Sequence, residues 1–141
     1  MITLILLSLV VYLAASINFS ILLFKMLGKG DPRDKFSGNA GTMNVNRQLG
    51  LIWALVVLLL DMGRAVAVAM VGTLFLPSMF VPVLGFFLVI GNQKPLFHRF
   101  RGGKGVASYL GFTAYISPVT AGISCLVWVI VYRLFLSLIH I

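Results

Sequence analysis

Four long apolar runs constrain the fold of this chain more than any other feature of its sequence. They cover residues 1–24, 51–76, 79–93 and 106–135. Of the 141 residues, 60% are hydrophobic and only 10% are charged, and the mean hydropathy is +1.07. A soluble domain carries roughly 25% charged residues. The sequence therefore predicts an all-α, polytopic integral membrane helix bundle with four to five spans in a single domain, residues 1–135.

The first and last runs differ in how they can cross a bilayer. Residues 1–24 suffice to cross about 30 Å of hydrocarbon as one helix. No Lys or Arg precedes this run, so it lacks the basic start of a signal peptide and is expected to be retained as a span. Residues 106–135 are too many for one untilted span, and Ser117-Pro118 in the middle predicts either a kink or a break between two helices.

The charge distribution predicts the topology. Lys and Arg number 11 against 3 acidic residues, which gives a net charge of +8. The cations flank the apolar runs, so we expect the lipid bilayer or an anionic substrate as partner, and no nucleic acid. Two basic segments, residues 25–50 and 92–104, are separated by two spans and an uncharged turn, which puts both on one side. The positive-inside rule places them in the cytoplasm and the N-terminus outside.

The most polar stretch is Ser37–Arg47, with the sequence SGNAGTMNVNR. Two glycines, three asparagines, two hydroxyl residues and an arginine are crowded into eleven positions between apolar runs. Carboxamides, a guanidinium and glycine-exposed amides are hydrogen-bond donors suited to oxyanions. We therefore predict a loop that holds a phosphate at the membrane surface.

A second candidate anion site is the RGGKG sequence of residues 101–105. It does not satisfy the G-x-x-x-x-G-K-[ST] pattern of nucleotide hydrolases. Glycines nevertheless let backbone amides approach an anion, Lys104 adds a point charge, and a helix is expected to begin at Val106 with its positive end toward the loop. The alternative is a flexible basic turn before a membrane helix, and the motif alone does not decide between them.

Other ionisable residues offer no conventional catalytic arrangement. Asp61 lies about 15 Å into the second span and has Arg64 three residues on, so the two could form an ion pair that is either structural or part of the site. His98 is interpreted as an interfacial, solvated side chain. The single Cys125 excludes an internal disulfide and a Cys-based zinc cluster, and no metal-ligand cluster or Ser-His-Asp set is apparent. Chemistry here must rest on positioning and charge neutralisation, without a metal or cofactor.

Taken together, the two polar motifs resemble a known family. Ser37–Arg47 resembles the S-G-N-x-G-A-T-N-x-x-R signature of the bacterial acyl-phosphate:glycerol-3-phosphate acyltransferases, the PlsY family. Phe100–Ala107, with the sequence FRGGKGVA, looks like that family's F-K-G-G-K-G-V-A signature. The spacing of the motifs and the Asp61–Arg64 element also fit. The resemblance covers residues 1 to about 133.

The resemblance implies a bacterial inner-membrane enzyme that moves a fatty acyl group from acyl phosphate to the 1-hydroxyl of glycerol 3-phosphate, yielding lysophosphatidic acid and phosphate. It implies catalytic roles for Ser37 and Arg47 and supporting roles for Asp61 and Arg64. The implied substrate-binding residues are Asn39, Gly41, Asn44, Gly102, Gly103, Lys104 and Gly105. The donor's acyl tail would lie between helices. The alternatives are a non-catalytic small membrane subunit, which sets orientation or binds anionic lipid, and an anion-binding transporter fragment. The oligomeric state is left open.

The chain also departs from the family pattern. Thr42-Met43 replaces the Ala-Thr of the first signature, Asn92 stands where a histidine is usual, and Arg64 replaces a lysine. The family's third, C-terminal signature is missing. Residues 136–141 match the translation of a sequencing-library adaptor and are expected to be non-native, which would remove His140 from consideration. This stretch of chain alone is therefore expected to be inactive.

Overall fold

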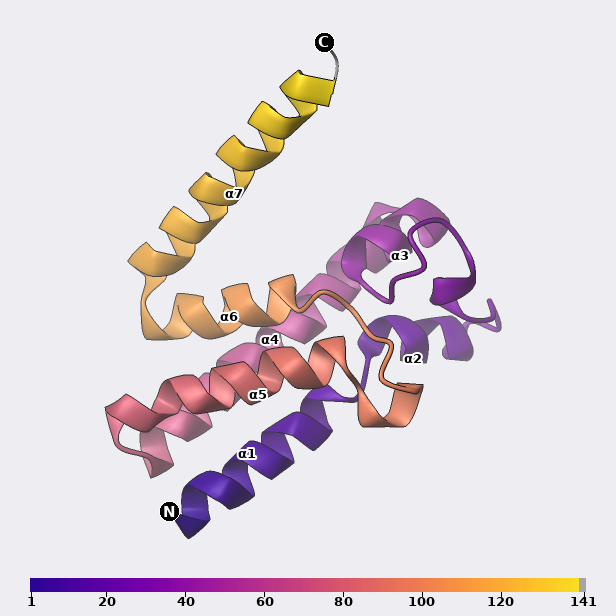
Figure 1. The fold of residues 1–141 in the computed structure, drawn as a ribbon. Helices are drawn as coiled ribbons and strands as arrows, with labels where there is room; N and C mark the ends of the chain where they lie inside the picture. Colours follow the sequence, from indigo (N-terminus) through magenta and orange to yellow (C-terminus); the bar gives the residue numbers. More distant parts are fainter. Residues whose placement is uncertain (140–141) are drawn as a thin grey trace.

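The computed structural model describes residues 1–139, without the side chains of residues 132 and 135–139, and all its regular structure there is helical (Figure 1). The predicted all-α class is confirmed. In chain order the elements are α1 (Ile2–Ala15), α2 (Phe19–Met26), the 3-10 turn η1 (Pro32–Asp34), α3 (Thr42–Leu49), α4 (Leu51–Phe75), η2 (Ser78–Phe80), α5 (Val81–Gln93), η3 (Leu96–His98), α6 (Val106–Ile116) and α7 (Pro118–Ile139).

Three helical segments of the described chain are long and apolar enough to cross a membrane. They are Ile2–Met26, Leu51–Phe75 and Ser78–His98. Val106–Ile116 and Pro118–Val131 are shorter apolar helices. These segments agree with the predicted integral membrane bundle, whereas the count of four to five spans and the side of the N-terminus stay predictions.

The first span is two helices, and the prediction of one continuous helix was wrong. The chain leaves α1 after Ala15 and enters α2 at Phe19. Asn18 has an extended backbone, and its side-chain oxygen accepts a hydrogen bond from the amide of Ile21 at 3.1 Å. A short carboxamide that caps a helix start competes with continuation of the preceding helix. Asn18 thus turns an apolar run into a broken span.

The last apolar run is broken, which decides between the two predicted alternatives. Ser117 is extended (φ −152°, ψ 95°) and separates α6 from Pro118, the first residue of α7. A residue before proline is disfavoured in the helical region, which explains the position of the break. Figure 1 shows α7 leaving the bundle at an angle to α6.

Helix α4 is at the centre of the packing. It lies against α3, α5 and α6, and α1 packs along α5. Glycines permit two close crossings: a Cβ on Gly111 would come within 2.7 Å of the Met62 carbonyl oxygen, and one on Gly91 within 2.6 Å of the Ala15 Cβ. Small residues at such crossings let membrane helices approach closely. One buried cluster joins α1, α4, α5 and α6, and a second joins α2, α3 and α4.

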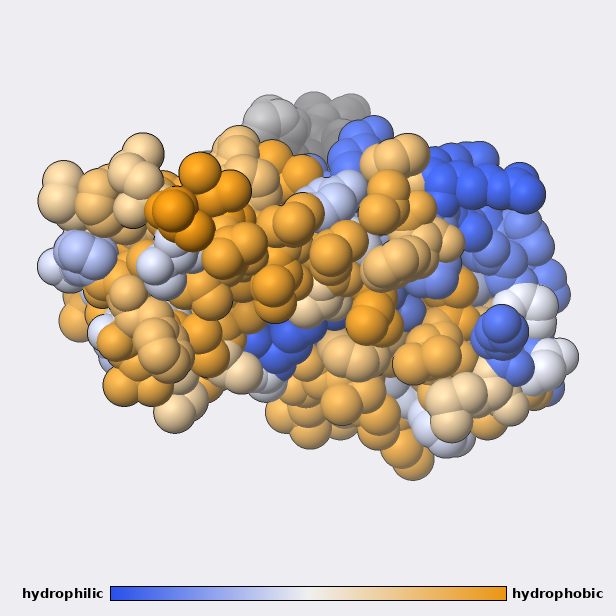
Figure 2. All heavy atoms as spheres, turned by 90° about the horizontal axis from the view of Figure 1, so that it is seen from below, coloured by the Kyte–Doolittle hydropathy of each residue, from blue (hydrophilic) through white to orange (hydrophobic). Residues whose placement is uncertain are grey.

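The surface separates an apolar body from a polar end. On α4, Ile52, Leu59 and Leu74 are 77%, 68% and 75% exposed, as expected for side chains that face lipid. Figure 2 shows an apolar face whose hydrophilic residues gather toward one end, the end where Figure 1 places α2 and α3. The candidate site lies at this polar end.

Candidate active site

The two polar segments meet in space, as the topology predicted. The amide of Ala40 donates to the carbonyl oxygen of Gly102 at 3.3 Å. The Arg33 guanidinium donates through Nη1 to the carbonyl oxygens of His98 and Arg101, both at 2.8 Å. Residues more than 60 positions apart in the sequence are therefore held together at one end of the bundle.

Only the first half of the Ser37–Arg47 stretch is a loop, so the prediction of a loop throughout was wrong. Helix α3 begins at Thr42, and Arg47 lies in its last turn. The helix forms because Val45, fully buried, completes an apolar cluster with Phe24, Ala54 and Val57. Tertiary burial on one face therefore outweighs the weak helix propensity of a sequence rich in asparagine.

Asn44 holds the loop together from within. Its side chain is 2% exposed, and its Nδ2 lies within hydrogen-bonding distance of the carbonyl oxygens of Pro32 (2.6 Å), Lys35 (3.2 Å) and Asn39 (2.9 Å). Gln48, one turn further along α3, donates to the same Pro32 carbonyl at 2.8 Å. The carboxamides that suggested phosphate binding are thus partly used to shape the backbone.

Ser37 and Arg47 are both exposed. Within the described part of the chain, neither side chain makes a hydrogen bond or an ion pair. Asn39 is half-buried and next to Ala40, whose amide contacts the second segment. Unlike Asn44, these side chains remain available to a ligand at the polar end of the molecule.

The glycines of the second segment dock it onto the end of α5. The amides of Gly102 and Gly103 donate to the carbonyl oxygens of Gln93 (3.1 Å) and Asn92 (3.0 Å). These carbonyls belong to the last turn of a helix and lack partners within it. A Cβ on Gly102 would overlap the Asn92 carbonyl oxygen, and one on Gly103 would lie 2.7 Å from Asn92 Oδ1. The two glycines are therefore needed for close packing, and their amides are not free for a phosphate as the sequence had suggested.

Lys104 and the start of α6 are the anion-facing groups that remain. Gly105 adopts a left-handed conformation (φ 77°) that turns the chain into α6. The first amides of that helix have no partner inside it. Lys104 is exposed, while its carbonyl oxygen accepts a hydrogen bond from Gln93 Nε2 at 3.0 Å. Lys104 thus stands two positions before Val106, the first residue of α6.

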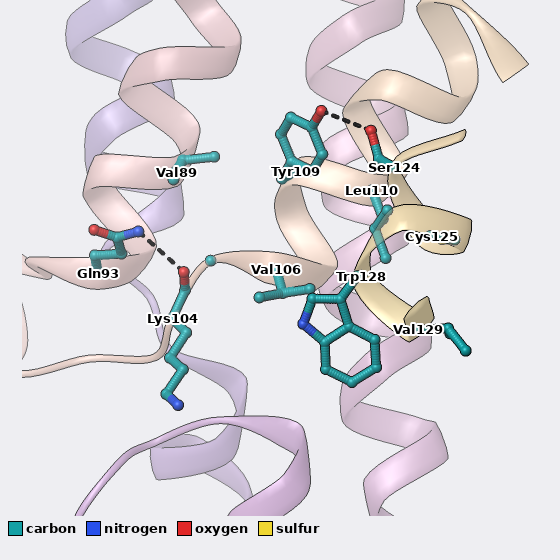
Figure 3. Close-up of a pocket in the computed structure, with 11 residues that line it drawn as sticks. Val89, Gln93, Lys104, Val106, Tyr109, Leu110, Ser124, Cys125, Trp128 and Val129 are labelled. Atoms are coloured by element: carbon teal, nitrogen blue, oxygen red, sulfur yellow. Dashed lines mark hydrogen bonds between the residues drawn. The ribbon is translucent and has the colours of Figure 1, made fainter. Parts of the chain in front are cut away.

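An apolar pocket of about 560 Å³ adjoins Lys104. Its walls come from α5, α6 and α7 and include Val89, Val106, Tyr109, Leu110, Cys125 and Trp128. Figure 3 shows the ammonium group of Lys104 at one end, directed away from Trp128 and Val129. Tyr109 and Ser124 join α6 to α7 through a hydrogen bond of 3.1 Å between their hydroxyls. The pocket suits an apolar tail and has a cationic residue, Lys104, at one end.

The predicted Asp61–Arg64 ion pair is present inside the bundle. Arg64 Nη2 lies 2.6 Å from Asp61 Oδ1, and each side chain is only 10% exposed. Arg64 Nη1 also donates to the carbonyl oxygens of Ile17 (2.6 Å) and Ala14 (3.3 Å), and its guanidinium lies 4.8 Å from the centre of the Phe19 ring. Arg64 therefore donates to carbonyl groups at the break between α1 and α2.

Two residues near the site were not predicted from the sequence to be site residues. Asn92, 4% exposed, donates through Nδ2 to Asp61 Oδ1 at 3.4 Å and contacts the glycine segment. Arg33, one of several cations before α3, is the one that joins the two segments. Its Nε donates to Asp31 at 2.8 Å, and this hydrogen bond holds the pKa of the Asp31 carboxyl below its ordinary value. Only the folded arrangement distinguishes either residue from its neighbours in sequence.

Comparison of this chain with known proteins identifies its family. A model of the glycerol-3-phosphate acyltransferase family matches residues 5–139. The chain belongs to this family. Among its curated relatives, glycerol-3-phosphate acyltransferase from Methylobacillus flagellatus is 40% identical over 124 residues, which cover 87% of this chain and 63% of the relative. The enzyme from Pseudomonas fluorescens is 36% identical over 130 residues, or 92% and 69% of the two chains.

Two solved structures share the fold. The crystal structure of PlsY, an integral membrane glycerol 3-phosphate acyltransferase, in its glycerol 3-phosphate form has a TM-score of 0.82 and 34% identity over 93% of this chain and 66% of that chain. Its lysophosphatidic acid form gives a TM-score of 0.77 at 33% identity. This chain thus spans about two thirds of PlsY and 63% of the Methylobacillus relative. The family match runs to residue 139; that residues 136–141 are non-native stays a prediction, and residues 140–141 lie outside the described part.

Proposed function

We propose that the intact protein transfers a fatty acyl group from acyl phosphate to the 1-hydroxyl of glycerol 3-phosphate in a bacterial inner membrane, with its basic segments in the cytoplasm. The hydroxyl oxygen attacks the acyl carbonyl carbon, and a new ester C–O bond forms. The bond between the carbonyl carbon and the phosphate oxygen breaks, and phosphate leaves with the electron pair. The hydroxyl proton goes to the departing phosphate, so the products are lysophosphatidic acid and hydrogen phosphate.

The observation that carries this proposal is the meeting of two cationic segments beside one apolar pocket. Ala40 and Gly102 join the segments, and Lys104, in the second segment, also lines the pocket. Each substrate carries a phosphate, and only the donor carries a long apolar tail. The arrangement offers cationic groups for both heads and a pocket for the tail. The forms of PlsY that have been solved are named for glycerol 3-phosphate and lysophosphatidic acid, and these correspond to the acceptor and product proposed here.

Within this scheme the exposed side chains of the first segment act on the donor. Arg47 and Ser37 hold the phosphoryl oxygens at the reacting end, with Asn39 and Gly41 in the same loop. Asn44 contributes by fixing the loop backbone, since its Nδ2 is surrounded by carbonyl oxygens. Phosphate is already a good leaving group, so positioning and neutralisation of charge suffice without a strong general base.

The second segment receives the acceptor. Lys104 and the free amides at the start of α6 bind the phosphate of glycerol 3-phosphate, because a cation and a helix N-terminus both favour an oxyanion. Gly102, Gly103 and Gly105 act through the backbone, which they allow to pack against α5 and to turn into α6. Asp61 and Arg64 support the site from inside the bundle.

The test is an acyl-transfer assay with acyl phosphate and radiolabelled glycerol 3-phosphate, using membranes that contain the full gene product. Ser37→Ala and Arg47→Ala are each expected to lower the rate by about a hundredfold or more. Gly103→Ala is expected to raise the apparent KM for glycerol 3-phosphate more than that for acyl phosphate. Gly122→Ala, a helix position with nothing within 4 Å of an added Cβ, is the matched control for the last variant. Absence of transfer, or transfer that Ser37→Ala and Arg47→Ala leave unchanged, would refute the proposal.

A further inference from the structure

Asn92 connects the buried ion pair to the glycine segment. Its backbone carbonyl accepts the Gly103 amide at 3.0 Å, and its Nδ2 reaches Asp61 Oδ1 at 3.4 Å. Its side-chain oxygen lies against Gly103, where an added Cβ would come within 2.7 Å of it. One residue therefore contacts both the carboxylate in α4 and the backbone that precedes Lys104.

The chain of contacts continues from Asn92 in both directions. On the membrane side, Asp61 is held by Arg64, which is anchored on the carbonyl groups of Ala14 and Ile17. On the loop side, Gly103 is followed directly by Lys104, whose carbonyl oxygen is fixed by Gln93. The break in the first span is thereby connected, through side chains with at most 10% exposure, to the segment that presents Lys104.

The arrangement also constrains what can stand at position 92. The carboxamide offers an N–H donor to Asp61 and an oxygen toward Gly103 at once, and a carboxylate or an apolar side chain cannot do both. A carboxylate there would place a second acceptor against Asp61 inside the bundle, which is strongly disfavoured. The orientation of the Asn92 side chain is therefore set by the charge of Asp61.

We propose that Asn92 is a positioning residue for the acceptor: oriented by the Asp61–Arg64 pair, it seats Gly102-Gly103 on α5 and so sets the position of Lys104. This inference rests on the proposed function for the identity of the acceptor only. Asn92 does not itself take part in the acyl-transfer chemistry. Its effect reaches the substrate through the backbone of residues 102–104.

The experiment exchanges the two partners in the full-length protein. Asn92→Asp is expected to raise the apparent KM for glycerol 3-phosphate by roughly tenfold, as for loss of a buried hydrogen bond, with much less effect on the KM for acyl phosphate. The double variant Asp61→Asn with Asn92→Asp restores one carboxamide donor and one carboxylate acceptor at the same contact. Because Asp61→Asn also removes the carboxylate partner of Arg64, the double variant is expected to recover part of the lost acceptor affinity, whereas general damage to the fold would accumulate in it.

A second measurement does not depend on activity. Cys125 is the one cysteine in the sequence, so a Cys125→Ser background allows a single reporter at Arg101→Cys, an exposed position. We expect a soluble maleimide to label this cysteine several-fold faster when Asn92→Asp is added, and more slowly again in the exchanged pair. A single variant that behaves like its parent, or an exchanged pair no better than the single variant, overturns the inference. If every form lacks acyl transfer, the proposed function fails while the labelling rates still decide the role of Asn92.

Discussion

The two polar segments of this molecule are built by opposite means. Within the segment around residues 31–50, the side chains of Asn44 and Gln48 donate to backbone carbonyl oxygens. The glycines of the segment around residues 92–105 dock through their backbone, since the amides of Gly102 and Gly103 donate to the last turn of α5. Both form part of one end of the bundle, yet they reach a fixed shape by different routes.

This contrast predicts how each segment responds to substitution. A segment held by side chains loses one or two hydrogen bonds when a residue is truncated, and the remaining bonds still keep its shape. A segment held by backbone contact depends on the absence of a Cβ, so the smallest side chain displaces it as a unit. The first segment should therefore respond gradually to substitution, and the second abruptly.

The largest expected effect is that of Gly102→Ala. An added Cβ would overlap the carbonyl oxygen of Asn92, so the segment must move and its two hydrogen bonds to α5 must break or lengthen. We expect a loss of about 3 kcal/mol in unfolding free energy, within the range for forced overpacking, measured as a lower thermal midpoint in detergent micelles. Gly122→Ala adds the same methyl group to open space in α7 and should not lower the midpoint. Equal thermal midpoints for Gly102→Ala and Gly122→Ala would contradict the expectation that an added Cβ displaces the second segment.

The architecture was largely predictable because hydropathy and charge are strong signals in a membrane protein. The second and third spans, the shared side of the basic segments and the Asp61–Arg64 pair all followed from residue type and spacing. The break at Ser16–Asn18 did not, because a hydropathy average gives little weight to three residues within an otherwise apolar run. What makes that break tolerable is Arg64, nearly fifty residues away, which donates to the carbonyl oxygens of Ala14 and Ile17.

The meeting of the two polar segments was predictable, but the hydrogen-bond partners of their residues were less so. The glycines at 102 and 103 were expected to expose amides to an anion, whereas the end of α5 competes for those amides with unpaired carbonyls. Asn44 was expected to face a substrate, and it donates into its own loop instead. In both cases the residue type was informative about hydrogen bonding, but the partner depends on which unpaired backbone groups the fold brings near.

An intermediate effect is expected for Asn44→Ala, the central change in the first segment. It removes a buried N–H donor that lies near three carbonyl oxygens, so those oxygens lose this hydrogen-bond donor. The expected loss is about 2 kcal/mol in unfolding free energy, read from the same thermal midpoint. Asn46→Ala, two residues along α3, is the matched control, because its half-buried side chain makes no hydrogen bond within the described chain and should cost much less. A loss as large as that of Gly102→Ala would show that the first segment also fails as a unit.

The smallest expected effect concerns the charge of Asp31, which supports Arg33 where the two segments meet. The Arg33 hydrogen bond lowers the pKa of Asp31 from its ordinary value of 3.8, so the carboxylate form favours the folded state. That stabilisation is complete above the ordinary pKa and is lost as the pH falls through the lowered value.

Asp31→Asn keeps the side-chain oxygen that accepts from the Arg33 amide but removes the charge. The parent should therefore exceed the variant in unfolding free energy by less than about 1 kcal/mol near neutral pH, since the pair is partly exposed. Thermal midpoints measured across pH should show this gap constant down to about pH 5 and closing below the ordinary pKa, because protonation then removes the charge from the parent as well. A gap that widens on acidification would mean that Asp31 does not stabilise the junction through Arg33.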